Sequence, residues 1–179
     1  ARAVCAEGED APEQVPVVLS SLVQKSLVVR EGEGDAQRLR VLETLRDYAR
    51  EKLEGMDPSG AAAGRHCAHY FALAKEAGRG IQGHDQGLWA ARLDAQIDNL
   101  RAAASCALGG GADPLIAVKL AVALTGFWIL RGHCAEGRRQ VDAALALPAV
   151  RQSPMAEAWA LYTGAALAGS QGDHEAASA

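Results

Sequence analysis

Two stretches near the end of the chain decide the fold: Phe127-Trp128-Ile129-Leu130-Arg131-Gly132-His133 and Leu167-Ala168-Gly169-Ser170-Gln171-Gly172-Asp173. In each, an apolar segment ends at a polar residue followed by glycine, and an alanine-rich segment begins at once. The two glycines, Gly132 and Gly172, lie 40 residues apart. Self-similarity at a period of about 20–50 residues is typical of solenoids, whose repeats stack because none buries its apolar face alone. The sequence therefore predicts a helical binding scaffold rather than an enzyme.

The composition limits the class of protein. Hydrophobic residues make up 49% of the chain but aromatic residues only 4%, so small side chains suited to close helix packing supply much of the core. The net charge of -4 argues against a general nucleic-acid binder, which should be basic. The most apolar run, residues 115–130, contains Lys119 and is shorter than the ~20 residues of a membrane span. We expect a helix covered by protein, and no membrane partner.

The cysteines and the absence of a leader sequence bear on the compartment. Cys5, Cys67, Cys106 and Cys134 are scattered singly, and no C-x-x-C motif occurs. This spacing fits neither a zinc knuckle nor a thioredoxin-type redox pair. Because no stretch resembles a signal peptide, we expect reduced, mostly buried thiols in a cytoplasmic protein.

The first part of the chain predicts a small α/β unit. Apolar residues at helical spacing predict a helix over residues 15–24. Two short apolar runs, residues 27–30 and 39–42, flank the turn sequence at residues 31–35 and predict a β-hairpin. A lone hairpin is marginally stable in water, so we expect it to pack on the neighbouring helices.

The rest of the chain predicts helices arranged in pairs. The expected helices cover residues 43–54, 62–77, 86–108, 114–131, 135–147 and 154–171, with another opening at Asp173. Asp113-Pro114 and Ser153-Pro154 each place an N-cap acceptor before a proline, which suits the first helical turn. Gly78, Gly80 and Gly83 are interpreted as a loop between helices.

A break in the pattern separates the two parts. Residues 56–60 read Met-Asp-Pro-Ser-Gly, a typical turn sequence. We predict a first unit over residues 1–55, in which the acidic residues 1–14 form a flexible end. The helical repeat domain is predicted over residues 60–179 and is expected to be truncated at its C-terminus.

Several motifs resemble a known family. Leu19-x-x-Leu22-x-x-Lys25-Ser26-Leu27-Val28 and Leu39-Arg40-Val41-Leu42-Glu43-Thr44-Leu45-Arg46-Asp47-Tyr48-Ala49 resemble the end of the winged-helix module in STAND-type regulatory ATPases, bacterial relatives of NB-ARC signalling proteins. Three further motifs follow in the family's order: His66-x-x-His69-Tyr70-Phe71, Asp98-Asn99-Leu100-Arg101-Ala102-Ala103 and Arg131-Gly132-His133-x-x-Glu136-Gly137-Arg138-Arg139. The resemblance covers residues 15–179 and implies a partial winged-helix unit followed by helical repeats.

The last hairpins are similar to tetratricopeptide repeats. Aligned on Gln171-Gly172-Asp173, the small packing positions of that family fall on Ala165 and Ala177. The 40-residue spacing exceeds the family's usual ~34. Its characteristic Trp, Leu-Gly and Tyr positions are occupied here by Leu161, Gly164-Ala165 and Ala168. The resemblance implies a degenerate, tetratricopeptide-like α-solenoid of antiparallel helix pairs.

The resemblance also implies a function for this segment. No G-x-x-x-x-G-K-[ST] phosphate loop occurs, so we expect neither nucleotide binding nor hydrolysis, no other enzymatic activity and no cofactor. The ATPase core of such a regulator would lie upstream of residue 1. The helical array would sense a protein, a peptide or a small effector, and relay that contact to the ATPase and to transcription through a shift between closed and open arrangements.

One arginine cluster is a candidate site for a partner. Arg131, Arg138 and Arg139 lie close to the glycine of the first hairpin. They could engage an acidic peptide or a phosphate, and the alternative is a solvated face of the solenoid. The concave surface of the solenoid is the natural partner site, but the sequence does not identify the side chains that line it.

A second arginine cluster, Arg38, Arg40 and Arg46, surrounds the predicted hairpin. Base readout needs Arg, Lys, Asn or Gln side chains supported by basic groups against phosphate. This patch is modest on an acidic chain, so DNA contact is possible for the full-length protein but is not expected from this segment. Direct DNA binding through the hairpin is the alternative function.

Three other patterns are given structural interpretations. His66 and His69 share a helical face, but no third ligand is placed to complete a metal site. Adjacent residues such as His66 and Cys67 point ~100° apart on a helix, which suits proton transfer poorly. Asp94 and Asp98 predict an exposed helical face rather than a catalytic pair. We therefore predict no metal site and no catalytic residue. The three tryptophans, one in each helical hairpin, predict repeated core contacts: Trp89, Trp128 and Trp159.

Overall fold

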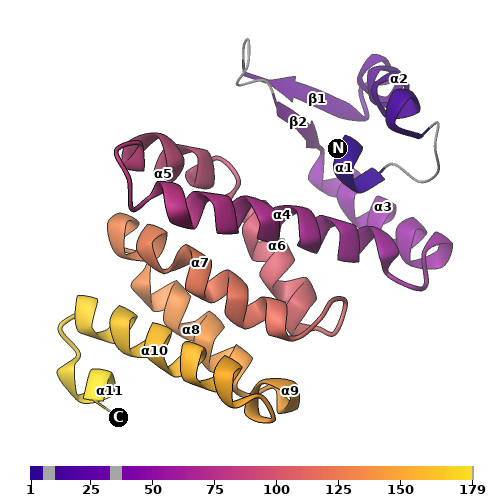
Figure 1. Cartoon of the computed structure of the whole chain (residues 1–179). Helices are drawn as coiled ribbons and strands as arrows, with labels where there is room; N and C mark the ends of the chain where they lie inside the picture. Colours follow the sequence, from indigo (N-terminus) through magenta and orange to yellow (C-terminus); the bar gives the residue numbers. More distant parts are fainter. Residues whose placement is uncertain (6–10, 33–37, 179) are drawn as a thin grey trace. The chain divides into compact units, whose positions relative to one another are not determined.

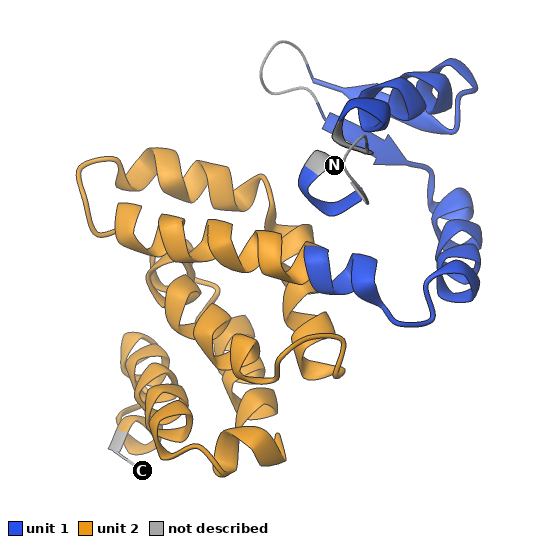
Figure 2. Ribbon diagram, turned by 45° about the vertical axis from the view of Figure 1, so that its right-hand side comes forward, with its two compact units in different colours: residues 1–65 blue, residues 66–179 orange. Residues whose placement is uncertain are grey.

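The computed structural model describes residues 1–5, 11–32 and 38–178. Within these residues the chain is mainly α-helical, with a single two-stranded antiparallel sheet (Figure 1). It divides into two compact units, Ala1–Arg65 and His66–Ala179 (Figure 2). The prediction of a mainly α fold that contains a β-hairpin is confirmed.

The first unit is built around the hairpin. Its elements are α1 (Arg2–Cys5), α2 (Ala11–Gln24), β1 (Val28–Glu31), β2 (Arg38–Val41) and α3 (Glu43–Met56). The two strands pair with Val28 opposite Val41 and Glu31 opposite Arg38. Val28 is buried, and α2 contacts β1, so the hairpin has the helical support that an isolated pair of strands needs. Residues 33–35 of the predicted turn, and residues 6–10 of the expected flexible end, lie outside the described residues.

The predicted break after α3 is a turn that starts the next helix. Asp57 accepts hydrogen bonds from the backbone N–H groups of Ala61 (3.0 Å) and Ala62 (2.7 Å) and from the Ser59 hydroxyl (2.7 Å). The bond from Ala62 is the main reason why the pKa of Asp57 lies below its ordinary value. A side-chain acceptor before the first turn satisfies N–H groups that the helix leaves unpaired, so Asp57 fixes where the helix begins.

The second unit consists of stacked helices. Its elements are α4 (Ala61–Gly80, with its first turn in the other unit), α5 (Gln86–Asp94), α6 (Ile97–Leu108), α7 (Leu115–Arg131), α8 (Cys134–Leu145), α9 (Pro148–Arg151), α10 (Pro154–Ser170) and α11 (His174–Ser178). Helix α7 contacts α6, α8 and α10, and α10 in turn contacts α8 and α11. Helix α6 also contacts both α7 and α8, so from α6 onward helices that follow one another in the chain pack side by side (Figure 1).

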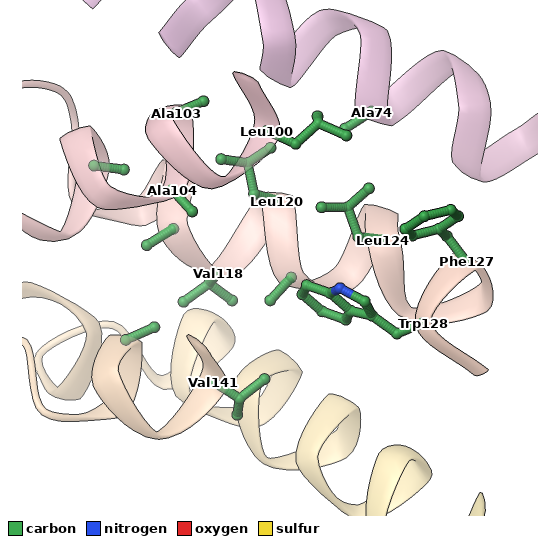
Figure 3. Close-up of a cluster of buried hydrophobic side chains, with 14 of the residues drawn as sticks. Ala74, Leu100, Ala103, Ala104, Val118, Leu120, Leu124, Phe127, Trp128 and Val141 are labelled. Atoms are coloured by element: carbon green, nitrogen blue, oxygen red, sulfur yellow. The ribbon is translucent and has the colours of Figure 1, made fainter. Parts of the chain in front are cut away.

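Helix α7 forms the centre of the core. Its side chains Leu120, Leu124, Phe127 and Trp128 are buried, and Val141 of α8 is buried on one side of them (Figure 3). The apolar run at residues 115–130 is therefore a helix covered by protein, as predicted. In the described parts of the chain, no helix combines the length and the apolar character that crossing a membrane requires.

The local start and stop signals are confirmed. Asp113 accepts a hydrogen bond from the N–H of Leu115 (3.0 Å), and Ser153 accepts one from Ala156 (3.4 Å). Gly132 and Gly172, after α7 and α10, have φ of +72° and +75°. This left-handed conformation is easy for glycine and reverses the chain after each helix. The short helix α9 was not predicted.

The single helix predicted over residues 86–108 is wrong. The chain forms α5 and α6 instead, separated by Ala95 and Gln96. Gln96 leaves helical geometry with φ of -119°, and its side-chain oxygen accepts hydrogen bonds from the Tyr70 hydroxyl (3.2 Å) and the Asn99 amide (3.0 Å). Contacts with another helix thus fix the break, and periodicity within the segment does not reveal them.

The interpretation of Gly78 and Gly80 as loop residues is also wrong, because both lie within α4. A Cβ on Gly78 would stand 2.7 Å from the backbone oxygen of Ala123 in α7, and a Cβ on Gly80 would overlap the Trp89 ring. These glycines permit close packing rather than a turn. Gly83 does lie in the connection between α4 and α5.

Candidate functional site

In the predicted partner site, Arg131 and Arg138 bind different acidic residues, and Arg139 has no hydrogen-bonded partner among the described residues. Arg131 forms an ion pair with Asp94 at the end of α5 (2.6 Å). Arg138 contacts Asp173 (2.8 Å) and the Gln171 side chain (3.2 Å), both in the connection between α10 and α11. The two arginines thus connect helices of neighbouring pairs, and each already has its own anionic partner.

The third arginine, Arg139, lies beside a stronger ion pair. Arg101 of α6 makes two 2.8 Å hydrogen bonds to the carboxylate of Glu136 in α8, and a 3.3 Å bond to Asp98. The hydrogen bonds from Arg101 are the largest cause that lowers the pKa of Glu136, and the charge of Arg139 adds to the effect. Arg101, Glu136 and Arg139 line a pocket of about 410 Å³. In this pocket Arg101 and Glu136 neutralise each other, whereas Arg139 is exposed and makes no ion pair among the described residues.

The histidine and cysteine patterns are explained by packing contacts. His66 Nε2 lies 3.3 Å from the Asn99 side-chain oxygen, and both His66 and His69 contact the ring of Tyr70. Across the described residues, no group of three or more His, Cys, Asp or Glu side chains is arranged to hold a metal ion. Cys67 is fully buried and donates to the Ala103 backbone oxygen (3.4 Å). Burial, together with the neighbouring Cys106, raises the pKa of the Cys67 thiol to about 11, so it is protonated at neutral pH.

The carboxylates Asp94 and Asp98 are exposed, as the sequence predicts, but they lie on different helices. Asp94 ends α5 and pairs with Arg131, whereas Asp98 lies in the first turn of α6 and pairs with Arg101 (3.3 Å). Each carboxylate is neutralised by its own arginine.

The arginines near the hairpin are exposed. Arg40 pairs with Glu31 across the two strands (3.1 Å), and Arg46 pairs with Glu43 one turn earlier in α3 (3.5 Å). Arg38 lies opposite Glu31 in the strand register. Acidic side chains thus accompany each cation, which lowers the positive potential that a phosphate backbone would meet.

A large groove in the helical unit was not identified from the sequence. We call it the α4–α7–α10 groove after the three helices that form most of its lining, and its volume is about 960 Å³. In Figure 1 these helices follow one another across one side of the unit. Helices α4, α7 and α10 come from three different parts of the helical unit, so the groove is formed by segments far apart in the sequence.

One wall of the groove is apolar and open to solvent. Met155, Trp159 and Tyr162 of α10 line it and are 70%, 48% and 67% exposed. The rings of Trp159 and Tyr162 meet edge to face, with centroids 6.0 Å apart. Helix α10 is thus apolar on two faces, one buried against α7 and α8 and one lining the groove. Exposed apolar surface of this kind marks binding sites.

The opposite side of the groove is basic. Lys75 and Arg79 of α4 and Lys119 of α7 line it, and none of the residues found in its lining is acidic. Lys119 lies 3.8 Å from Asp113, outside the lining. Among the described residues, neither Lys75 nor Arg79 makes an ion pair. The groove therefore combines unpaired positive charge with exposed aromatic surface, which suits an apolar partner that also carries carboxylates.

The prediction that the tryptophans make repeated core contacts holds for one of the three in full. Trp128 is fully buried and Trp89 is half-buried, whereas Trp159 is 48% exposed. A sequence signal for the groove did exist: Met155, Trp159, Tyr162 and Ala166 follow one another at helical spacing on α10. That stripe lies beside a second one, Ala160, Thr163 and Leu167, which forms the buried face. Two adjacent apolar stripes cannot be assigned to core and groove without the neighbouring helices.

Comparison with known proteins gives relatives for most of the chain. It is similar to three proteins described as "Putative HTH-type transcriptional regulator", one from Mycobacterium bovis (strain ATCC BAA-935 / AF2122/97) and two from Mycobacterium tuberculosis (strains CDC 1551 / Oshkosh and ATCC 25618 / H37Rv). In each case 39% of 136 aligned residues are identical, which covers 76% of this chain. The match spans 15% of the length of each relative. No protein-family model and no solved structure matches this sequence.

Proposed function

We propose that this chain is a non-enzymatic regulatory segment of a transcriptional regulator, and that its helical unit binds a protein partner in the α4–α7–α10 groove. The observation that carries the proposal is the groove itself, with exposed apolar side chains on α10 and unpaired cations on α4. The similarity to proteins described as transcriptional regulators supports the wider role.

The proposed segment works by relay rather than by chemistry. The family resemblance of residues 15–179 suggests that the winged-helix-like unit passes the contact to an ATPase core elsewhere in the protein. A partner that binds one arrangement of the helices better than another shifts the population toward it. The proposal assigns no catalytic role to any residue. Cys67 is buried, and Asp94 and Asp98 each form an ion pair with an arginine.

The proposal is tested in cells that carry the altered natural gene. We expect the Met155→Ala/Trp159→Ala double variant to change the same set of transcripts as deletion of the gene, because it removes two exposed side chains of the groove. Leu161→Ala is the matched control, since Leu161 lies on the same helix and is 56% exposed but does not line the groove. Transcripts that respond to deletion but not to the double variant would contradict a role of the groove.

Direct DNA binding through the hairpin is the second candidate function. The description "HTH-type" of the relatives favours it, as do the exposed cations Arg38, Arg40 and Arg46. On this proposal, affinity for duplex DNA falls steeply with salt. Replacing the three arginines with alanine removes up to three phosphate contacts and flattens that dependence. Absence of measurable binding by the unaltered chain at low salt would exclude this function for the segment.

A further inference from the structure

This inference rests on the proposed function and names the occupant of the groove. We infer that the α4–α7–α10 groove binds an acidic amphipathic α-helix of a partner protein. The apolar face of that helix packs on Met155, Trp159 and Tyr162 of α10, and its carboxylates face Lys75 and Arg79 of α4.

The apolar wall has the geometry that receives a helix. Met155, Trp159, Tyr162 and Ala166 follow the spacing i, i+4, i+7 and i+11, so they form one ridge along α10. A ridge of this kind packs into the groove between side-chain rows of a second helix. Aromatic side chains and methionine are also the residues enriched at the centre of protein interfaces. An amphipathic helix with apolar residues at i, i+3, i+4 and i+7 complements this wall.

The positive charge of the groove favours acidic residues on the polar face of the partner helix. Lys75 and Arg79 contribute two cations without an ion pair among the described residues, and Lys119 contributes a third that lies 3.8 Å from Asp113, outside the lining. The segment as a whole carries a net charge of -4, so this local excess of positive charge runs against the average of the chain. Opposite charges on a partner would both speed its approach and fix its orientation.

Three hydroxyl groups of the groove, those of Thr125, Thr163 and Ser153, already have partners within the protein, which favours a helix over an extended peptide. The hydroxyl of Thr125 donates to the Ala121 backbone oxygen (2.9 Å), and that of Thr163 donates to the Trp159 backbone oxygen (2.8 Å). The Ser153 hydroxyl is already the N-cap acceptor of α10. An extended peptide needs external donors and acceptors for its backbone, whereas a helix satisfies its own. The walls are helices and offer no strand edge to which a peptide strand could add.

The exposure of the lining argues against a small molecule as the occupant. Sites for small ligands are concave and bury about 70–90% of the ligand surface. Here Met155 and Tyr162 are 70% and 67% exposed, and the volume of 960 Å³ lies in an open trough between three helices. A small ligand would leave much of its surface in water, whereas a helix covers the length of the apolar ridge.

Three labelled peptides of about 16 residues, near the length at which isolated helices begin to form, test the inference by fluorescence anisotropy with the whole 179-residue chain. Each carries leucine at i, i+3, i+4 and i+7, and its other face is rich in Glu, Gln or Lys. We expect the Glu peptide to bind about tenfold more tightly than the Gln peptide, as a few exposed ion pairs allow, and its affinity to fall with added salt. A Glu peptide of shuffled sequence controls for composition, and we expect it to bind weakly.

Replacing basic residues of the groove with acidic ones tests whether the peptides bind in the groove. In the Lys75→Glu/Arg79→Glu variant we expect the preference to reverse, so that the Lys peptide binds more tightly than the Glu peptide. The Arg92→Glu/Arg139→Glu variant makes the same change in net charge outside the groove, and we expect it to keep the original preference. We expect the Trp159→Ala variant to bind the Glu peptide more weakly than the unaltered chain does, and the Leu161→Ala variant to bind it equally well. Circular dichroism of each variant verifies that it is folded.

The outcomes separate this inference from the proposed function. Equal affinity for the Glu and Gln peptides, no binding of any peptide, or an equal loss in the Arg92→Glu/Arg139→Glu variant would overturn the acidic helix as occupant. The transcript experiment with Met155→Ala/Trp159→Ala does not use these peptides, so a groove-dependent response there would leave the proposed function standing. Peptide binding without any change of transcripts in that experiment would overturn the proposed function alone.

Discussion

Replacing Gly78 with alanine tests whether α4 and α7 are held together by backbone contact. An added Cβ would stand 2.7 Å from the backbone oxygen of Ala123, so α4 and α7 must separate by about 0.7 Å to restore an ordinary contact of 3.4 Å. No side chain can rotate to relieve this overlap, because the atom it meets is backbone. Overpacking typically costs about 1–3 kcal/mol, while replacing a helical glycine with alanine recovers up to ~1 kcal/mol. We expect a net loss of about 1–2 kcal/mol.

Two other helical glycines, Gly169 and Gly126, serve as controls for the Gly78→Ala variant. Gly169 lies in α10 with nothing within 4 Å of its added Cβ, so Gly169→Ala should raise the free energy of unfolding by up to ~1 kcal/mol through helix propensity alone. At Gly126 the new Cβ would meet only the Ile81 side chain, at 3.2 Å. Since a side chain can yield, we expect Gly126→Ala to be close to neutral.

Urea unfolding followed by circular dichroism measures the series. With a slope of about 2 kcal/mol per molar urea, Gly78→Ala should lower the midpoint by about 0.5–1 M, and Gly169→Ala should raise it slightly. Gly78→Ala should also weaken the binding of a partner in the groove, because Gly78 lines the groove. A Gly78→Ala protein as stable as the unaltered chain would refute the close approach of α4 and α7.

Three further predictions concern the caps and the buried groups. Gly132→Ala should cost about 1–2 kcal/mol in urea unfolding, because its φ of +72° is strained for a residue with a Cβ; an unchanged midpoint would contradict the left-handed cap. Hydrogen bonds from Arg101 lower the pKa of Glu136, so this carboxylate stabilises the fold above its unfolded pKa of about 4.5 and loses that effect as the pH falls through the lower folded value. Glu136→Gln should therefore lower the free energy of unfolding by ~1 kcal/mol at neutral pH and leave it unchanged in acid. Urea unfolding of both proteins at several pH values measures this difference, and a difference that persists in acid would count against the ion pair. Because burial raises the pKa of Cys67 to about 11, a thiol reagent near neutral pH should label the exposed Cys5 first, and rapid labelling of Cys67 in the folded chain would contradict its burial.

The features that the sequence predicted correctly depend on local backbone chemistry. Asp113-Pro114 and Ser153-Pro154 start α7 and α10, because an acceptor side chain and a proline act within a single turn. Gly132 and Gly172 end them, because only glycine enters the left-handed region at little cost. The hairpin was also predictable, since its apolar runs flank a turn sequence. The predicted unit boundaries and the arginine sites stay predictions.

The features that could not be predicted depend on contacts between distant segments. The break at Gln96 is fixed by the Tyr70 hydroxyl, which lies in another helix. Gly78 has the composition of a loop residue, and only the backbone of Ala123 reveals why a helix needs glycine there. Trp159 has the character of a core residue, but the pairing of helices leaves its face of α10 in solvent. In each case the residue was compatible with two environments, and the tertiary neighbours decided between them.

The three walls of the groove come from three helices far apart in the sequence, so the shape of the groove depends on the angles between these helices. A small change in the angle between neighbouring helices alters the curvature of the stack, and with it the distance from Arg79 on α4 to Trp159 on α10. A helix bound to all three walls would fix that curvature, and the stiffened stack would bind a second ligand at a lower entropic cost. Amide hydrogen exchange should then slow along the whole of α4, α7 and α10, well beyond the residues that the partner touches.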